Sequence, residues 1–169
     1  MLLVFGGLPA SGKSTLSKCV ARKLQAVYVR VDSIEQALRD EGFNRVYGEG
    51  YAVAYQLAAD NLLFGSTVVA DSVNSISMTR NAWRFVGESI GVPVIEIEIM
   101  CSDKAEHRQR VETRVDRIAG LIQPTWDEVI ARDYEPWEEA CIVIDTAGEE
   151  PDASCEKTLA LIESILTTL

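Results

Sequence analysis

The sequence has little of what metal-binding or disulfide-rich domains depend on. It contains one histidine, His107, and four cysteines that form no CxxC pair: Cys19, Cys101, Cys141 and Cys155. A structural zinc site needs four Cys or His ligands at characteristic spacings, so no such site is predicted. We expect the four thiols to be free and mostly buried, as in a protein of a reducing compartment.

A membrane segment and an excess of positive charge are also missing. No uninterrupted apolar run approaches the roughly 18 residues of a membrane helix, and residues 2–5, apolar but without a basic leader, are too short for a signal peptide. We therefore expect a cytoplasmic protein without membrane contact. The 16 basic and 26 acidic residues give a net charge of −10. This sign is opposite to that of a general binder of the nucleic-acid backbone, so a nucleic-acid partner is disfavoured.

The pattern of the chain is that of an α/β protein. A length of 169 residues fits one domain, residues 1–169. Apolar runs favour strands at 2–5, 26–31, 67–70, 94–100 and 142–144, and helical periodicity favours helices at 14–25, 34–40, 48–64, 78–90 and about 153–166. This alternation predicts a three-layer sandwich, with helices on both faces of a five-stranded parallel sheet in the order 2-3-1-4-5.

The strongest motif is a phosphate-binding loop between the first expected strand and the first expected helix. The residues that match GxxxxGK[ST] are Gly7, Leu8, Pro9, Ala10, Ser11, Gly12, Lys13 and Ser14, and Thr15 follows them. Glycines let the backbone wrap around phosphates, and amides from about Ala10 to Thr15 point at the anion. Lys13 neutralises the β- and γ-phosphate oxygens, and the Ser14 hydroxyl ligates Mg²⁺. The motif predicts a nucleoside triphosphate, ATP, as ligand.

Polar residues follow two further strands. Asp32 comes after the second strand and Asp71 after the third. The carboxyl ends of parallel strands line the ligand crevice, so both carboxylates are expected near the γ-phosphate. Asp32 is predicted to take the proton of an alcohol acceptor, or else to cap the next helix. Asp71 is predicted to ligate Mg²⁺ or water, or else to serve a turn. Asn74 is a candidate substrate contact or a solvent-facing turn residue.

A basic segment precedes the sequence IAGLIQP. Its four arginines are Arg108, Arg110, Arg114 and Arg117. A basic helix followed by a loop with Gly and Pro suits a mobile lid at about residues 108–126. The alternative is a solvated charged helix, because acidic residues are interleaved with the arginines.

Together these segments resemble a known family. The stretches GLPASGKST, VDSIEQAL, VVADSVNS…TRNAW and HRQRVETR resemble the small P-loop kinases of the AAA_33 type over about residues 1–146. These are similar to zeta-toxin kinases, chloramphenicol phosphotransferase, gluconate kinases and polynucleotide 5′-hydroxyl kinases. The resemblance implies that Asp32 takes the acceptor's proton, that Asp71 lies near the metal and that a lid arginine stabilises the transferring phosphoryl group. We favour Arg114 and Arg117 for this last role, with Arg108 or Arg110 as anchors.

The resemblance leaves the acceptor open. The stretch NRVYGEGYAVAY is expected to cover the acceptor pocket, with Arg45, Tyr47 and Tyr51 as contacts, but matches no acceptor signature. Thr146 and Ala147 are expected to touch the nucleotide base. The leading hypothesis is a kinase that transfers the γ-phosphoryl group of ATP to a hydroxyl of a small molecule, acting as a monomer or homodimer. The alternatives are a non-catalytic or slowly hydrolysing nucleotide-dependent switch and a polynucleotide 5′-hydroxyl kinase.

Overall fold

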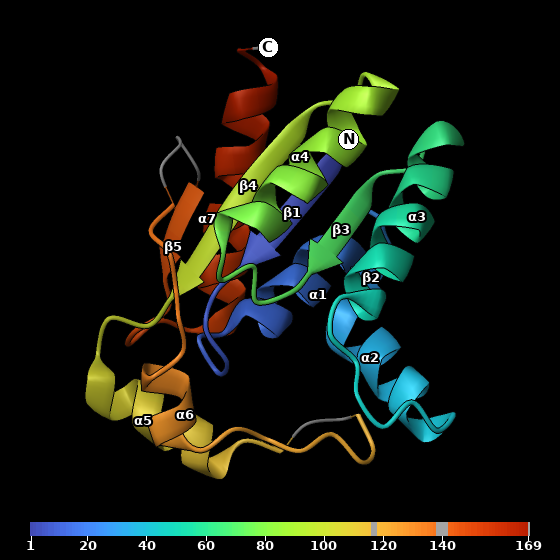
Figure 1. Cartoon of the computed structure of the whole chain (residues 1–169). Helices are drawn as coiled ribbons and strands as arrows, with labels where there is room; N and C mark the ends of the chain where they lie inside the picture. The colour runs from blue at the N-terminus through green and yellow to red at the C-terminus, as the bar shows by residue number, and fades with distance from the viewer. Residues whose placement is uncertain (116–117, 138–141, 169) are drawn as a thin grey trace.

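The computed structural model describes residues 1–115, 118–137 and 142–168. Its parallel sheet has five strands in the order β2-β3-β1-β4-β5, which confirms the predicted topology (Figure 1). The strand bounds are β1 Leu2–Gly6, β2 Val27–Arg30, β3 Val68–Asp71, β4 Val94–Met100 and β5 Ile142–Asp145. A crossover connection separates each strand from the next, as parallel pairing requires.

Strand β1 is central because its residues are apolar on both faces. Leu3 and Phe5 enter the core cluster on one side of the sheet, and Leu2 and Val4 enter the cluster on the other side. All four side chains have 0% exposed area. Alternate residues of a strand point to opposite faces, so a continuous apolar run predicts burial on both. The loop that follows β1 therefore leaves the middle of the sheet.

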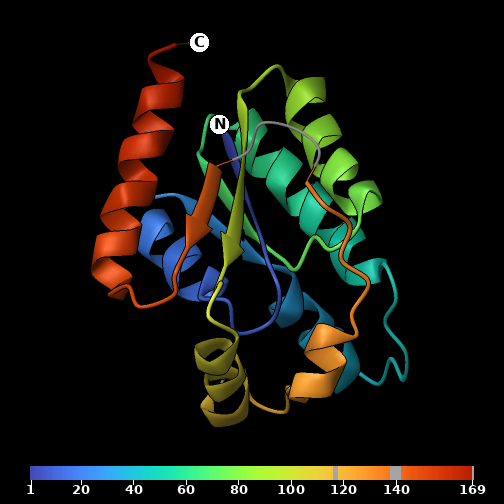
Figure 2. The ribbon, with the colours of Figure 1, turned by 90° about the vertical axis from the view of Figure 1, so that its left-hand side faces the viewer.

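Helices cover both faces, which completes three layers (Figure 2). Helices α1 (Lys13–Lys23) and α7 (Pro151–Leu166) pack on one face, and α3 (Glu49–Leu63) and α4 (Ser77–Ile90) pack on the other. Helices α2 (Val31–Asp40), α5 (Lys104–Thr113) and α6 (Trp126–Ile130) lie beyond the carboxyl ends of the strands (Figure 1). None of the helices in the described ranges is both long and apolar enough to cross a membrane.

Two helix boundaries and one additional helix near the carboxyl ends of the strands differ from the expected pattern. Helix α2 begins at Val31, so Asp32 lies in its first turn and is not its cap. Helix α5 ends at Thr113, and Arg114 is extended at φ −64° and ψ 139°. The short helix α6 was not predicted. Its signal was present, because Thr125 and Glu128 form a capping box at its start.

The expectation that all cysteines are free thiols is wrong for two of them. Cys19 of α1 and Cys155 of α7 form a disulfide across 136 residues of sequence. The two helices lie side by side on one face of the sheet (Figure 2). Because the two cysteines are far apart in the sequence, no local cysteine spacing could have predicted this disulfide. Cys101 is buried and free, and Cys141 lies outside the described residues.

Candidate active site

The loop between β1 and α1 has a backbone that requires glycine at two positions. Gly7 has φ 144° and Gly12 has φ 97°, both in the region that side chains avoid. A Cβ atom on Gly7 would lie 2.2 Å from the carbonyl oxygen of Ile99, and one on Gly12 would lie 3.1 Å from Thr146 Cγ2. The loop thus curls tightly against its neighbours before α1 begins at Lys13. The first residues of α1, Lys13, Ser14 and Thr15, line the cleft, and a helix N-terminus can bind an anion through its free amides.

Side chains of α5 and of the residue after β5 form hydrogen bonds that fix the phosphate-binding loop. His107 is buried, and its Nε2 lies 2.8 Å from the carbonyl oxygen of Pro9. Thr146 Oγ1 donates to the carbonyl oxygen of Ser11 at 2.8 Å. Arg110 donates to Thr146 twice, to Oγ1 and to the carbonyl oxygen, each at 2.8 Å. These bonds engage two loop carbonyls, so α5 is anchored to the phosphate-binding loop.

Asp71, at the end of β3, is buried next to the cleft without lining it, and it is contacted by several polar side chains. Lys13 Nζ lies 2.7 Å from its Oδ1, and the Tyr28 hydroxyl donates to its Oδ2. The side chain of Ser14 also bonds to it. Asp71 has no exposed area, and burial alone would raise its pKa. The charge of Lys13 and the hydrogen bonds from Lys13, Tyr28 and Ser14 outweigh burial and lower the pKa of Asp71 to about 2. Asp71 is therefore a carboxylate at neutral pH.

Arg30, which the sequence analysis did not single out, joins the two aspartates. Its Nη2 lies 3.1 Å from Asp32 Oδ2, and its Nε lies 3.9 Å from Asp71 Oδ2. The Arg30 side chain is 5% exposed and that of Asp32 is 30% exposed, so Asp32 keeps access to the cleft. An arginine inside the apolar strand VYVRV was the available signal, because buried arginines are almost always paired.

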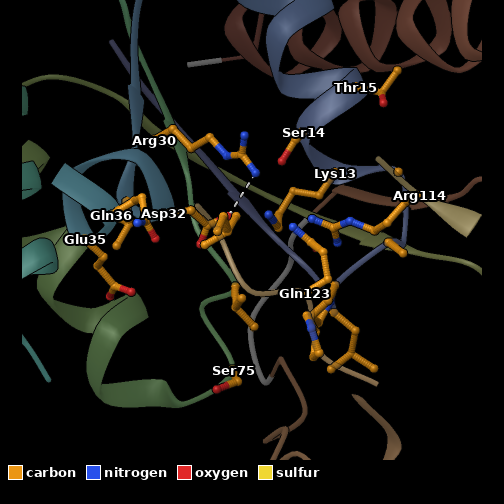
Figure 3. Close-up of a pocket in the computed structure, with 18 of the residues that line it drawn as sticks. Lys13, Ser14, Thr15, Arg30, Asp32, Glu35, Gln36, Ser75, Arg114 and Gln123 are labelled. Atoms are coloured by element: carbon orange, nitrogen blue, oxygen red, sulfur yellow. Dashed lines mark hydrogen bonds and ion pairs between the residues drawn. The ribbon is translucent and has the colours of Figure 1, made fainter. Parts of the chain in front are cut away.

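The basic segment brings at least one arginine to the cleft. Arg114 lines it, and Figure 3 shows Arg114 and Lys13 reaching into the same pocket. Arg108 lies outside the lining, is 61% exposed and pairs with Glu112 at 2.8 Å. Arg117 lies outside the described residues. Of the two arginines favoured from the sequence, Arg114 is therefore the one that the structure places.

The cleft is large and locally basic. Its volume is about 1890 Å³, above the roughly 300–1,000 Å³ of a site for one drug-sized ligand. Its basic lining residues are Lys13, Lys18, Arg22, Arg30, Arg39, Arg110, Arg114 and Arg132, and its acidic ones are Asp32, Glu35, Asp40, Glu149 and Glu150. Half of the 16 basic residues of an acidic chain thus gather around one cleft. It has room for a nucleotide and a second ligand.

Two of the expected substrate contacts do not line the cleft. Asp32, Tyr47 and Tyr51 line it, whereas Asn74 and Arg45 do not. Asn74 has 0% exposed area, and its side-chain amide donates to the Phe5 carbonyl oxygen at 3.1 Å. Its φ of 50° folds the turn after β3 back under the loop. Arg45 is exposed and donates to the Tyr47 hydroxyl at 3.4 Å. The assignment of Asn74 and Arg45 as substrate contacts is therefore corrected.

Other lining residues were missed by the sequence analysis. One face of α2 contributes Glu35, Gln36, Arg39 and Asp40, and the segment before α6 contributes Gln123 (Figure 3). Both side-chain amide atoms of Gln123 are buried and have no hydrogen-bond partner among the described residues. Burial raises the pKa of Glu35, although its bond with Arg39 opposes this. The helical spacing of the α2 residues, three and four apart, could have revealed their common face.

The residues at the loop fit a magnesium ion held together with phosphates. Within the described ranges, no group of three or more His, Cys, Asp or Glu residues forms a metal site. Mg²⁺ in phosphate-transfer sites uses only one or two protein ligands and completes its shell with phosphate oxygens and water. The adjacent Ser14 hydroxyl and Asp71 carboxylate supply such a pair.

The comparisons with known proteins agree with this geometry. The AAA_33 family, described as an AAA domain, matches residues 2–133. The chain belongs to the AAA_33 family. Among curated proteins, none matches this sequence.

Solved structures similar to this AAA_33 protein include Kti12 from Chaetomium thermophilum in complex with ADP-AlF3, at a TM-score of 0.74 and 19% identity over 97% of this chain and 98% of that one. The APS kinase CysC from Mycobacterium tuberculosis, with AMPPNP and APS, has a TM-score of 0.71 and 20% identity over 96% of each chain. A gluconokinase from Sinorhizobium meliloti 1021 has a TM-score of 0.68 and 15% identity over 98% of this chain and 95% of that one. These neighbours confirm the P-loop kinase fold.

Proposed function

We propose that this AAA_33 protein is an ATP-dependent phosphotransferase that moves the γ-phosphoryl group to a hydroxyl of a small molecule. The observation that carries the proposal is that Lys13, Ser14 and Asp32 line one cleft and that Lys13 and Ser14 bond to the buried carboxylate of Asp71 beside it. They come from α1, α2 and β3, and their side chains lie within one connected set of bonds through Arg30. The cleft's volume of about 1890 Å³ supports two ligands bound together.

The roles follow from position and chemistry. The loop amides hold the β- and γ-phosphates, and Lys13 moves from Asp71 to their oxygens. Ser14 and Asp71 would hold Mg²⁺, which would supply positive charge to neutralise the phosphates. Asp32 accepts the proton of the attacking hydroxyl, which is worth typically ~10²–10⁴ in rate. Arg114, with Arg117 as the second candidate, stabilises the charge of the transferring group.

The nucleotide base is assigned to the wall of the cleft beside the phosphate-binding loop, near Thr146. Thr146 lines the cleft together with Pro151 and Ser154 at the start of α7. Ala147 does not line the cleft, so Thr146 is the better placed of the two expected base contacts. The two hydrogen bonds from Arg110 to Thr146 hold this wall of the cleft in position relative to the phosphate-binding loop.

The test is transfer from γ-labelled ATP into a pool of extracted metabolites. We expect one new labelled phosphoester with the wild-type protein and none with Lys13→Ala. Lys23→Ala is the matched control, because Lys23 is exposed, belongs to the same helix and does not line the cleft. Calorimetry with Mg-ATP and Mg-GTP gives the binding readout in parallel. Absence of heat with both nucleotides at millimolar concentration, for a protein that folds, refutes the proposal.

A nucleotide-dependent switch is the second candidate. It is favoured by the pairing of Asp32 with Arg30 at 3.1 Å, which occupies one oxygen of the proposed base. Slow ATP hydrolysis that no metabolite stimulates, together with a conformational change, would support it. A polynucleotide 5′-hydroxyl kinase is less well supported, because a net charge of −10 opposes binding of a polyanion.

A further inference from the structure

Arg30 lies at the point where β2 ends and α2 begins. It is the last residue of β2 and is in register with Asp71, the last residue of β3. Residues in register on neighbouring strands point to the same face of a sheet, so the Arg30 side chain lies beside the Asp71 carboxylate. The chain enters α2 directly at Val31, which places Asp32 in the first turn of that helix. The passage from strand to helix therefore sets Arg30 between the two aspartates.

The Arg30 guanidinium faces the two carboxylates with different nitrogen atoms. Its Nη2 donates a hydrogen bond to Asp32 Oδ2 at 3.1 Å (Figure 3), and its Nε lies 3.9 Å from Asp71 Oδ2. The first contact has the length of a hydrogen bond, whereas the second is a looser ion pair. Because a guanidinium is planar and rigid, one group relates the position of Asp32 to that of Asp71.

Asp71 is the fixed partner of this arrangement. It is fully buried, and it is held by Lys13 Nζ at 2.7 Å, by the Tyr28 hydroxyl and by the side chain of Ser14. Lys13 and Ser14 belong to the phosphate-binding loop and the start of α1, so the position of Asp71 is tied to the place where phosphates would bind. Through Arg30, this fixed position extends to Asp32.

Asp32 is the partner that needs to be held. Its side chain is partly exposed, whereas that of Arg30 is buried. A carboxylate at the edge of a cleft has several rotamers within reach, but a general base must lie about 2.6–3.2 Å from the group whose proton it takes. The bond from Arg30 engages Oδ2, so Oδ1 is the oxygen that we assign to the hydroxyl proton.

We infer that Arg30 is a positioning residue that holds Asp32 at the distance from the phosphate-binding loop that proton transfer requires. The inference rests on the proposed kinase function. In the reaction, the acceptor's hydroxyl oxygen bonds to the γ-phosphorus, the bond from that phosphorus to the β-phosphate oxygen breaks, and the hydroxyl proton passes to Asp32. Arg30 exchanges no proton and acts only through Asp32. A displacement of about 1 Å in a reacting group can cost ~10²-fold in rate, so the loss of Arg30 should lower kcat.

The test is a double-mutant cycle of Arg30→Met and Asp32→Asn. Arg30→Met removes the guanidinium and keeps an apolar stem. Transfer from γ-labelled Mg-ATP into the extracted metabolites is followed in single turnovers over a dilution series of the metabolites, which separates the maximal rate from half-saturation. We expect Arg30→Met to lower the maximal rate by ~10–100-fold. Half-saturation, and the Kd for Mg-ATP measured by calorimetry, should stay within about 2-fold, the size expected for an independent site.

The Asp32→Asn background decides between positioning and a structural role. There, Arg30→Met should lower the remaining rate by no more than about 2-fold, because no base is left to position. A merely structural role would lower the rate by the same factor in both backgrounds. Equal losses in the two backgrounds therefore overturn the inference, and so does an undiminished rate in Arg30→Met alone. A wild-type protein that transfers no phosphoryl group overturns the kinase and this inference together.

Two further variants separate the geometry of Arg30 from its charge. Arg30→Lys keeps a positive charge beside Asp71 but lacks the planar fork, so its rate should remain well below that of the wild type. A wild-type rate with lysine shows that charge alone is sufficient and overturns the positioning role. If Arg30→Met does not fold, Arg30→Lys replaces it in the cycle. The matched control is Arg84→Met, which removes an ion pair with Glu96 at 2.8 Å outside the cleft lining and should keep the wild-type rate.

Discussion

The ammonium of Lys13 lies 2.7 Å from a carboxylate oxygen of Asp71, and both side chains are buried. This ion pair joins the phosphate-binding loop to the end of β3 before any phosphate is present. Nucleotide binding must exchange it for contacts between Lys13 and phosphate oxygens, so Asp71 then needs another cation beside it. Arg30 and Mg²⁺ are the candidates, one from β2 and one from solution.

The acid stability of the protein depends on Asp71. Its pKa is lowered from 3.8 to about 2 in the folded state, so its ionisation stabilises the fold above pH 4. This contribution, about 2 kcal/mol, is lost as the pH falls from about 4 to about 2. We expect Asp71→Asn to have a lower free energy of unfolding than the wild type at neutral pH. We also expect this free energy to fall less than that of the wild type as the pH drops from about 4 to about 2. Urea titrations between pH 2 and pH 6 measure it.

The exposed residue Asp60 provides the control for that titration. Asp60→Asn removes an exposed carboxylate of α3 whose only hydrogen-bond partner among the described residues is Gln56. We expect the free energy of unfolding of Asp60→Asn to fall between pH 4 and pH 2 as it does in the wild type. An equal fall in the wild type and in Asp71→Asn would contradict the assignment of Asp71.

Asp32 is tested by separating chemistry from binding. We expect Asp32→Asn to lower the rate of phosphoryl transfer by ~10²–10⁴, because the amide cannot accept the hydroxyl proton. The Kd for Mg-ATP should change little, since the Asp32 side chain is 30% exposed and lies on the acceptor side of Lys13 (Figure 3). Single-turnover transfer and calorimetry measure the two effects. Asp60→Asn again serves as control, and full turnover by Asp32→Asn would refute the role of base.

Arg114 is tested against its neighbour Arg108. An arginine that stabilises a transferring phosphoryl group is worth ~10³–10⁵ in rate, and we expect a loss in this range for Arg114→Ala. Arg108→Ala should retain nearly full activity, because Arg108 is 61% exposed and, within the described part of the chain, forms an ion pair only with Glu112. The kcat values of the two variants decide the matter. If Arg114→Ala loses less than about 10-fold, Arg117 becomes the stronger candidate.

The sheet and the phosphate-binding loop could be predicted because their signals are local. Strand β1 is an unbroken apolar run, and the loop matches a complete motif. Both features depend on the backbone geometry of consecutive residues, so they can be recognised in the sequence. Asp32 and Asp71 could be placed in the same way, because the ends of parallel strands converge at one edge of the sheet. The phosphate-binding loop and the two aspartates near it could therefore be located from the sequence.

The rest of the cleft could not be predicted, because it depends on side chains that meet across distant elements. Asn74 and Arg45 were expected to contact substrate from their place in the sequence, but Asn74 is buried and neither residue lines the cleft. The roles of Arg30 and Gln123 depend on their neighbours in the folded structure, which are distant in the sequence. The end of α5 at Thr113 likewise depends on the chain path beyond the helix, which helical propensity does not encode.

The disulfide between Cys19 and Cys155 was missed for the same reason, and it makes the last prediction. It fastens α1 to α7 beside the cleft, since Lys18 and Ser154, their neighbours in sequence, line the cleft. Crosslinks that close long loops contribute typically ~2–4 kcal/mol, chiefly by restricting the unfolded chain. We expect dithiothreitol to lower the Tm of the wild-type protein by several degrees. Cys155→Ser should show the lower Tm with or without reductant, and a wild-type Tm that ignores reductant would show that the bond does not form in solution.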